Sequence, residues 1–194
     1  MAKRTTPDGA SIPRERLLRT ASELFYREGI HSVGVDRIVE AAGVTRATFY
    51  RHFPGKEDLV EAYLGVEDAN IRGALDGAEA IAGADPSALL AAVIEGLADD
   101  VARHHTRGCP FINAAAEYPD PASGVRRTVD AHRTWFRHEL ERLLAAARVE
   151  DPAEAAGELV LLRDAAMVGG YLDGWERVRP SFIAAARRAA RMSE

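Results

Sequence analysis

The chain has 194 residues, of which 47% are hydrophobic and 28% are charged, a composition typical of a globular protein with a substantial core. No apolar run approaches the roughly 18 residues that a membrane-spanning helix needs, and the polar, basic first residues do not resemble a secretory signal. The one cysteine, Cys109, excludes an internal disulfide and suits a reducing compartment, so we expect a cytoplasmic protein without a membrane partner.

The net charge of −5 is unevenly distributed along the chain. Residues 1–56 carry a net charge of +4, whereas residues 57–194 carry −9. A basic head on an acidic body is expected where only the head meets a polyanion such as nucleic acid. The alternative is that the unevenness arose by chance.

Apolar residues recur with the 3.6-residue period of helices along almost the whole chain, and no segment alternates with the two-residue period of strands. We therefore expect an all-α fold of about nine helices, with a head of residues 1–56 and a body of residues 57–194. The helices are expected at residues 14–28, 35–42, 46–52, from 56 onward, 86–105, 111–117, 123–148, 152–173 and 180–192.

The second and third of these helices are short and are joined by the segment Ala42-Gly43-Val44. Gly43 permits the positive φ that a tight turn between helices often needs, and the Thr45 hydroxyl is placed to cap the third helix. Phe49 and Phe53 are expected to pack inward. The outer side then offers hydrogen-bond donors and an aromatic ring, which suits insertion into a major groove of DNA.

The stretch from Phe25 to Leu59 resembles the DNA-binding head of the tetracycline-repressor-like (TetR) family. The matching features include Gly29 at the end of the first helix, the Ala42-Gly43-Val44 turn, the run Thr48-Phe49-Tyr50, and Lys56. This resemblance implies a helix-turn-helix regulator that binds double-stranded DNA as a homodimer, most often as a repressor.

The resemblance implies DNA contacts from the second and third helices and from the start of the fourth. The expected DNA-binding residues are Ser32, Arg37, Thr45, Arg46, Thr48, Tyr50, Arg51, His52 and Lys56. For Arg37 and Arg51, surface salt bridges are the alternative. Lys3 and Arg4 form a basic arm that could enter a minor groove or stay solvated. Gly34 replaces the Ser or Thr that more often caps the second helix in this family.

In this family the body encloses a small-molecule pocket. The run Arg107-Gly108-Cys109-Pro110-Phe111, with Asn113 and Glu117, resembles a subgroup that answers to flavonoids, lincosamides and other lipophilic compounds. A lipophilic or aromatic effector needs aromatic walls and a few polar groups. The expected ligand-binding residues are Phe111, Asn113, Tyr118, Trp135, Phe136, Met167, Tyr171 and Trp175. For each aromatic residue, ordinary core packing is the alternative.

The family also dimerises through its last two helices. Small residues between 157 and 170 would let a partner helix approach closely, although packing within one chain is the alternative. The expected dimer-interface residues are Leu161, Ala165, Val168, Gly169, Leu172, Phe182 and Ile183.

Cys109 lies close in sequence to His104 and His105, which raises three further hypotheses. A Cys/His nucleophile lacks an orienting partner, and a metal site lacks a fourth ligand, so we expect neither an enzyme nor a metal or other cofactor. A redox-sensing thiol is the third, and a small buried residue is the alternative to all of them. The functional alternative to a repressor is a ligand- or redox-sensing protein that activates transcription or does not bind DNA.

Overall fold

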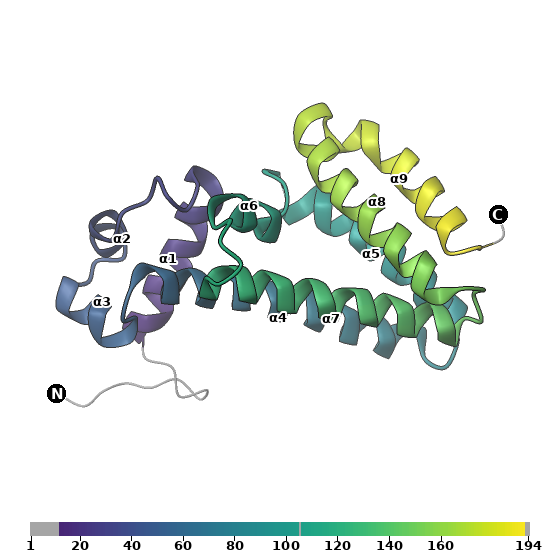
Figure 1. Ribbon diagram of the computed structural model, residues 1–194, viewed down its shortest axis with the longest axis horizontal. Coiled ribbons are helices and arrows are strands. Elements are labelled where there is room, and N and C mark those ends of the chain that lie inside the picture. The colour runs from purple at the N-terminus through teal and green to yellow at the C-terminus, as the bar shows by residue number, and fades with distance from the viewer. Residues whose placement is uncertain (1–11, 105, 193–194) are drawn as a thin grey trace. The chain divides into compact units, whose positions relative to one another are not determined.

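The computed structural model describes residues 12–104 and 106–192, and over these ranges it contains nine α-helices and no strand (Figure 1). The all-α prediction is confirmed. The helices are α1 (Ile12–Glu28), α2 (Val35–Ala41), α3 (Arg46–His52), α4 (Lys56–Ala82), α5 (Pro86–His104), α6 (Pro110–Glu117), α7 (Gly124–Ala146), α8 (Pro152–Asp173) and α9 (Trp175–Ala189).

Helix α9 differs most from its predicted range of 180–192. It begins at Trp175, directly after Gly174, whose φ of 88° ends α8, and it contains Pro180 in its interior. Proline is favoured in the first turn of a helix, and this preference placed the predicted start too late. Because the backbone nitrogen of Pro180 carries no hydrogen, α9 continues there with one main-chain hydrogen bond fewer.

The chain divides into two compact units. Unit 1 comprises the residues up to Glu67 together with Pro110–Val129, and unit 2 comprises Asp68–Cys109 and Asp130–Glu194. Helix α6 and the start of α7 therefore group with the helices of the head, although the expected head ended at residue 56.

In unit 1, α1, α2 and α3 pack against one another around a small apolar core. Phe49 of α3 has no exposed surface and Phe53 is buried beside it, with ring centroids 6.1 Å apart. Both phenylalanines point inward as predicted. The other buried side chains of this core include Leu17, Ala21, Leu24, Phe25, Val33, Ile38, Leu59 and Tyr63.

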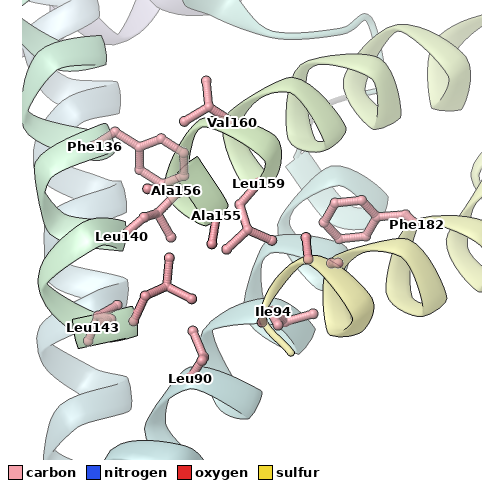
Figure 2. Packing of buried hydrophobic residues seen from close by; sticks show 14 of the residues in the cluster. Leu90, Ile94, Phe136, Leu140, Leu143, Ala155, Ala156, Leu159, Val160 and Phe182 are labelled. Carbon is pink, nitrogen blue, oxygen red and sulfur yellow. The ribbon is translucent and has the colours of Figure 1, made fainter. Parts of the chain in front are cut away.

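In unit 2, α8 and α9 lie side by side and α5 packs against both (Figure 1). Apolar side chains from these helices and from α7 meet in one core, which Figure 2 shows from close by. The labelled members are Leu90, Ile94, Phe136, Leu140, Leu143, Ala155, Ala156, Leu159, Val160 and Phe182. Within this unit, two contacts join α4 to α7. Asp68 of α4 forms a hydrogen bond with His132 of α7, and Glu79 of α4 forms an ion pair with Arg142 of α7.

Leu159→Ala should destabilise unit 2 by about 2–5 kcal/mol, because Leu159 is 1% exposed and the truncation leaves a cavity. Ile81→Ala is the matched control, since Ile81 is 88% exposed and its truncation removes little contact. Urea unfolding followed by circular dichroism measures both. Equal stabilities of the two variants would show that Leu159 does not belong to a close-packed core.

Candidate nucleic-acid interface

The outward face of α3 is polar and accessible. Arg46, Ala47, Tyr50 and Arg51 are all exposed, and their spacing places them on one side of the helix, opposite Phe49. The Tyr50 side chain, at 50% exposure, is the only large apolar or aromatic residue that α3 presents to solvent. A short helix with guanidinium and hydroxyl donors on one face has the shape and chemistry that fit a major groove.

The start of α3 is fixed by Thr45. Its hydroxyl accepts a hydrogen bond from the backbone N–H of Thr48 at 3.1 Å, as predicted for an N-cap, and lies 2.9 Å from the Thr48 hydroxyl. Thr48 is therefore half-buried and partly engaged at the cap. Both hydroxyls keep a free lone pair or proton for a further partner, because each oxygen can donate once and accept twice.

The turn before α3 is held from α1. Gly43 adopts a φ of 60°, which a residue with a Cβ rarely adopts, and its carbonyl accepts a hydrogen bond from Arg16 Nη2 at 3.2 Å. Helix α2 starts at Val35, and Gly34 before it is the N-cap, with no side-chain hydrogen bond. These contacts fix the angle between α2 and α3, and so fix where the face of α3 points.

Two of the expected DNA-binding arginines form ion pairs on the surface. Arg37 bonds to Glu28 at 2.7 Å, which is the alternative considered for it, and Arg46 Nε lies 2.9 Å from Asp36. The hydrogen bond from Arg27, together with the charges of Arg37 and Arg27, lowers the pKa of Glu28. Ion pairs this exposed are weak because water screens the charges, so a phosphate or a guanine edge can displace the carboxylates.

The remaining expected contacts lie around α3. Ser32 is exposed, whereas His52 and Lys56 are half-buried. Lys56 begins α4, its Nζ lies 6.0 Å from the centre of the Phe25 ring, and burial lowers its pKa although Glu117 opposes the shift. Lys3 and Arg4 lie outside the described residues.

Sequence reasoning missed the contact that Glu117 makes at the end of α6. Its carboxylate accepts hydrogen bonds from the backbone N–H groups of Ile30, at 2.8 Å, and His31, at 2.5 Å. These are the residues that follow Gly29, whose φ of 90° turns the chain out of α1. The ring of His31 also lies 5.0 Å from that of Tyr118.

Glu117 thus ties α6 to the turn between α1 and α2, and we call this contact the Glu117 clamp. A charged acceptor on two N–H groups is stronger than a neutral one. The available signal was the charge itself, because an acidic residue at the C-terminal end of a helix is disfavoured by the helix dipole unless another group holds it.

The residues expected to bind an effector fall into both units. In unit 1, Phe111 is buried while Asn113 and Tyr118 are half-buried; in unit 2, Met167 and Phe136 are buried and Trp135 and Trp175 are partly buried. The rings of Trp135 and Phe136 are 6.3 Å apart, and Trp175 instead contacts Phe182 at 6.2 Å. Tyr171 is 53% exposed and lies outside the buried aromatic group.

The residues expected at a dimer interface divide into two sets. Leu161, Val168 and Leu172 are 70%, 45% and 70% exposed, and Ala165 is exposed beside them. Ile183 is half-buried against the core. Phe182 is 5% exposed inside the core of its own chain, and Gly169 faces α9, since a Cβ there would lie 3.3 Å from Val178 Cγ2.

Cys109 is 1% exposed and accepts a hydrogen bond from Arg163 Nη1 at 3.1 Å. Its burial agrees with the simplest of the alternatives considered for it. Among the side chains that the structure describes, no group of three His, Cys, Asp or Glu residues could hold a metal ion. The side chains of His104 and His105 are not among them. Over residues 12–104 and 106–192, no helix combines the length and apolar character that crossing a bilayer requires.

Two family models match the chain. Residues 17–63 match the bacterial regulatory proteins of the TetR family, and residues 86–177 match a tetracycline-repressor-like C-terminal domain. The transcriptional regulator AcuR of Cereibacter sphaeroides is 31% identical over 176 residues, which cover 89% of this chain and 77% of that protein.

The crystal structure of SCO4454, a TetR-family transcriptional regulator from Streptomyces coelicolor, superposes with a TM-score of 0.87 at 45% identity, over 92% of this chain and 94% of that one. The transcriptional activator FasR of Mycolicibacterium smegmatis is similar over a shorter segment, being 36% identical over 73 residues that cover 36% of this chain and 32% of FasR. The chain belongs to the TetR family of DNA-binding transcriptional regulators, which are not enzymes.

Glu117→Ala should expose the amides of Ile30 and His31, because the variant removes the carboxylate that accepts from both. Hydrogen–deuterium exchange at these two amides should accelerate by at least about tenfold, as expected for losing a hydrogen bond to a charged group. Glu117→Gln, which keeps one acceptor oxygen, should fall in between. Unchanged exchange in Glu117→Ala would contradict the Glu117 clamp.

Proposed function

We propose that this regulator is a homodimeric repressor that binds a palindromic operator and leaves it when a small lipophilic or aromatic effector binds the body. The observation that carries the proposal is the outward face of α3, where Arg46, Tyr50 and Arg51 are exposed while Phe49 anchors the helix from behind. The basic charge of residues 1–56 supports DNA as the partner.

An apolar row on α8 supports dimerisation. Leu161, Ala165, Val168 and Leu172 follow one another at steps of four, three and four residues, so they lie on one face of the helix. All four are exposed in the single chain. A row of exposed leucines and valine on one helix is costly in water, and a second copy of the same helix would cover it around a twofold axis.

The Glu117 clamp supports the coupling between effector and DNA. Helix α6 begins directly after Cys109, which contacts Arg163 of unit 2, and ends at Glu117, which holds the α1–α2 turn of the head. A movement of α6 would therefore act on the backbone at Ile30 and His31. The differential binding needed for a useful response is a few kcal/mol.

The class of effector rests on the buried aromatic residues of the body and on the resemblance of residues 107–117 to regulators that answer to flavonoids and lincosamides. We infer repression rather than activation because regulators of this family act most often as repressors. Activation is the second candidate, because a 73-residue segment of this chain is 36% identical to part of FasR, which is a transcriptional activator.

Selection from a pool of random DNA duplexes, followed by gel-shift titration, tests the proposal. The full-length protein should enrich an inverted repeat and bind it far more tightly than a scrambled duplex of the same length. Failure to enrich any sequence at low salt, with a folded dimer, would overturn DNA binding as the function. A lipophilic compound that releases the complex in a screen would support the effector, and one that strengthens it would favour activation.

Lys56→Ala and Arg46→Ala should change DNA binding in different ways. Lys56→Ala should weaken binding to all sequences and reduce the slope of log affinity against log salt by about one, as expected for losing one phosphate contact. Arg46→Ala should lower the preference at one base position by about 1–3 kcal/mol. Fluorescence anisotropy at several salt concentrations measures both effects.

Arg142→Ala is the matched control for these variants, because Arg142 is an exposed arginine of unit 2 that pairs with Glu79 and Glu139. Its affinity for the operator should equal that of the wild type. An unchanged salt slope in Lys56→Ala would exclude a phosphate contact there, and an unchanged base preference in Arg46→Ala would exclude base recognition by that residue.

The double variant Leu161→Glu/Leu172→Glu should be monomeric, since it places charges on the exposed apolar row of α8. Ile81→Glu is the control, because Ile81 is also exposed but belongs to α4. Sedimentation velocity gives the mass of each. A double variant that remains dimeric would exclude this face of α8 as the dimer interface.

A further inference from the structure

Two basic side chains are buried among the described residues, and both belong to unit 2. His132 is 4% exposed and Arg163 is 5% exposed, on α7 and α8 respectively. Each stands on the apolar face of its helix, where the sequence pattern would place an aliphatic residue. Burying a guanidinium costs several kcal/mol unless its donors are satisfied, so Arg163 needs a specific reason to be there.

One edge of the Arg163 guanidinium is occupied. Both hydrogen bonds that it donates to described residues leave from Nη1, one to Cys109 Sγ at 3.1 Å and one to Asp164 Oδ1 at 3.3 Å. Its Nε is fully buried and has no acceptor among the described residues. The edge formed by Nε and Nη2 carries two parallel N–H groups, which is the arrangement that binds a carboxylate through both oxygens.

The nearby carboxylates are already shared. Asp164 also accepts a hydrogen bond from Arg133 at 2.8 Å, and Asp68 is held by Arg72 at 2.6 Å and by His132 at 2.7 Å. Burial lowers the pKa of His132, although its bond to Asp68 opposes the shift. Three arginines, Arg72, Arg133 and Arg163, are therefore paired with only two aspartates, Asp68 and Asp164. This group of five side chains carries one positive charge in excess.

Aromatic rings lie beside this group. Arg163 Cζ is 5.7 Å from the centre of the Phe136 ring, which in turn stacks on His132 at 6.1 Å with an angle of 10° between the planes. The ring centres of Trp135 and Phe136 are 6.3 Å apart. The Arg72 guanidinium lies over the Trp135 ring, with Cζ 3.8 Å from the ring centre. In Figure 2, Phe136 and Val160 lie together at one end of the apolar core.

We propose that Arg163 anchors the effector through a carboxylate, so that the regulator answers to a small aromatic monocarboxylate. The acid group bonds to Nε and Nη2 of Arg163, and the ring lies against Phe136 and Trp135. Binding neutralises the excess positive charge and satisfies the buried Nε. This inference rests on the proposed function, since it names the chemical class of the effector.

The test compares acids with their uncharged amides on the full-length protein. Benzoate and trans-cinnamate are the probes, and benzamide and trans-cinnamamide, which are similar in shape, are the references. Isothermal titration calorimetry should give a Kd for at least one acid that is about tenfold or more below that of its amide, because the amide cannot form the ion pair. If neither acid binds more tightly than its amide, the inference is wrong.

Variants at Arg163 connect the preference to this residue. Arg163→Met replaces the buried charge with an apolar chain, a change that cores often tolerate, and should abolish the preference for the acid. Arg163→Lys keeps the charge without the paired N–H groups and should lose most of it. Arg142→Met, an arginine of α7 outside this group, is the control and should bind as the wild type does.

The outcomes separate the two proposals. Preference for the acid that persists in both Arg163 variants overturns this inference, and so does release of the operator by neutral compounds alone. Arg163-dependent binding of an acid without any release of the operator supports the carboxylate site but overturns effector-controlled repression. If Arg163→Met does not fold, as judged by circular dichroism, the comparison with Arg163→Lys and the acid–amide comparison on the wild type decide the result.

Discussion

The reading head depends on the burial of Phe49. Helix α3 has seven residues, and an isolated helix of fewer than about 12 residues is marginal in water, so α3 exists only because it is held by contacts outside itself. Phe49 supplies the anchor within the core of α1 and α2, while Thr45 caps the first turn and Arg16 holds the preceding carbonyl of Gly43. A helix fixed from behind can expose its entire outer face. That division between a buried and an exposed side leaves Arg46 and Tyr50 accessible, as the proposed groove contact requires.

The same division recurs on α8, with a different consequence. Its inner face carries Leu159 and Met167 into the core, and its outer face presents a row of apolar residues that the single chain leaves uncovered. Arg163 lies on the inner face, where it departs from the apolar pattern and contacts Cys109 just before α6 begins. Helix α6 then ends at the Glu117 clamp. The segment from Cys109 to Glu117 thus contacts the buried Arg163 at its first residue and the backbone of the head at its last.

The pattern of apolar residues predicted most of the helices and the inward faces of the head, because helical periodicity and capping residues are local signals. Pro180 misled the prediction, since proline usually opens a helix and here lies inside one. The destination of Phe182 could not be predicted, because a large apolar residue suits a core and an interface equally well. In the Glu117 clamp, Glu117 binds Ile30 and His31, which precede it in the sequence by 87 and 86 positions. The hydrogen bond from Arg163 to Cys109 depends on the packing of α8 beside Cys109. The local sequence does not identify the partner in either pairing, although an acidic residue at the C-terminal end of α6 indicates that some group holds Glu117.

Methylation interference on the selected operator shows whether α3 reads DNA through the major groove. Dimethyl sulfate modifies guanine N7 in the major groove and adenine N3 in the minor groove, so a single experiment compares the two. If α3 lies in the major groove, N7 methylation should block binding at two clusters of guanines related by the twofold axis, with the major grooves about one helical turn or a multiple of it apart. Interference restricted to adenine N3, or its absence from every guanine of the operator, would exclude major-groove recognition by α3.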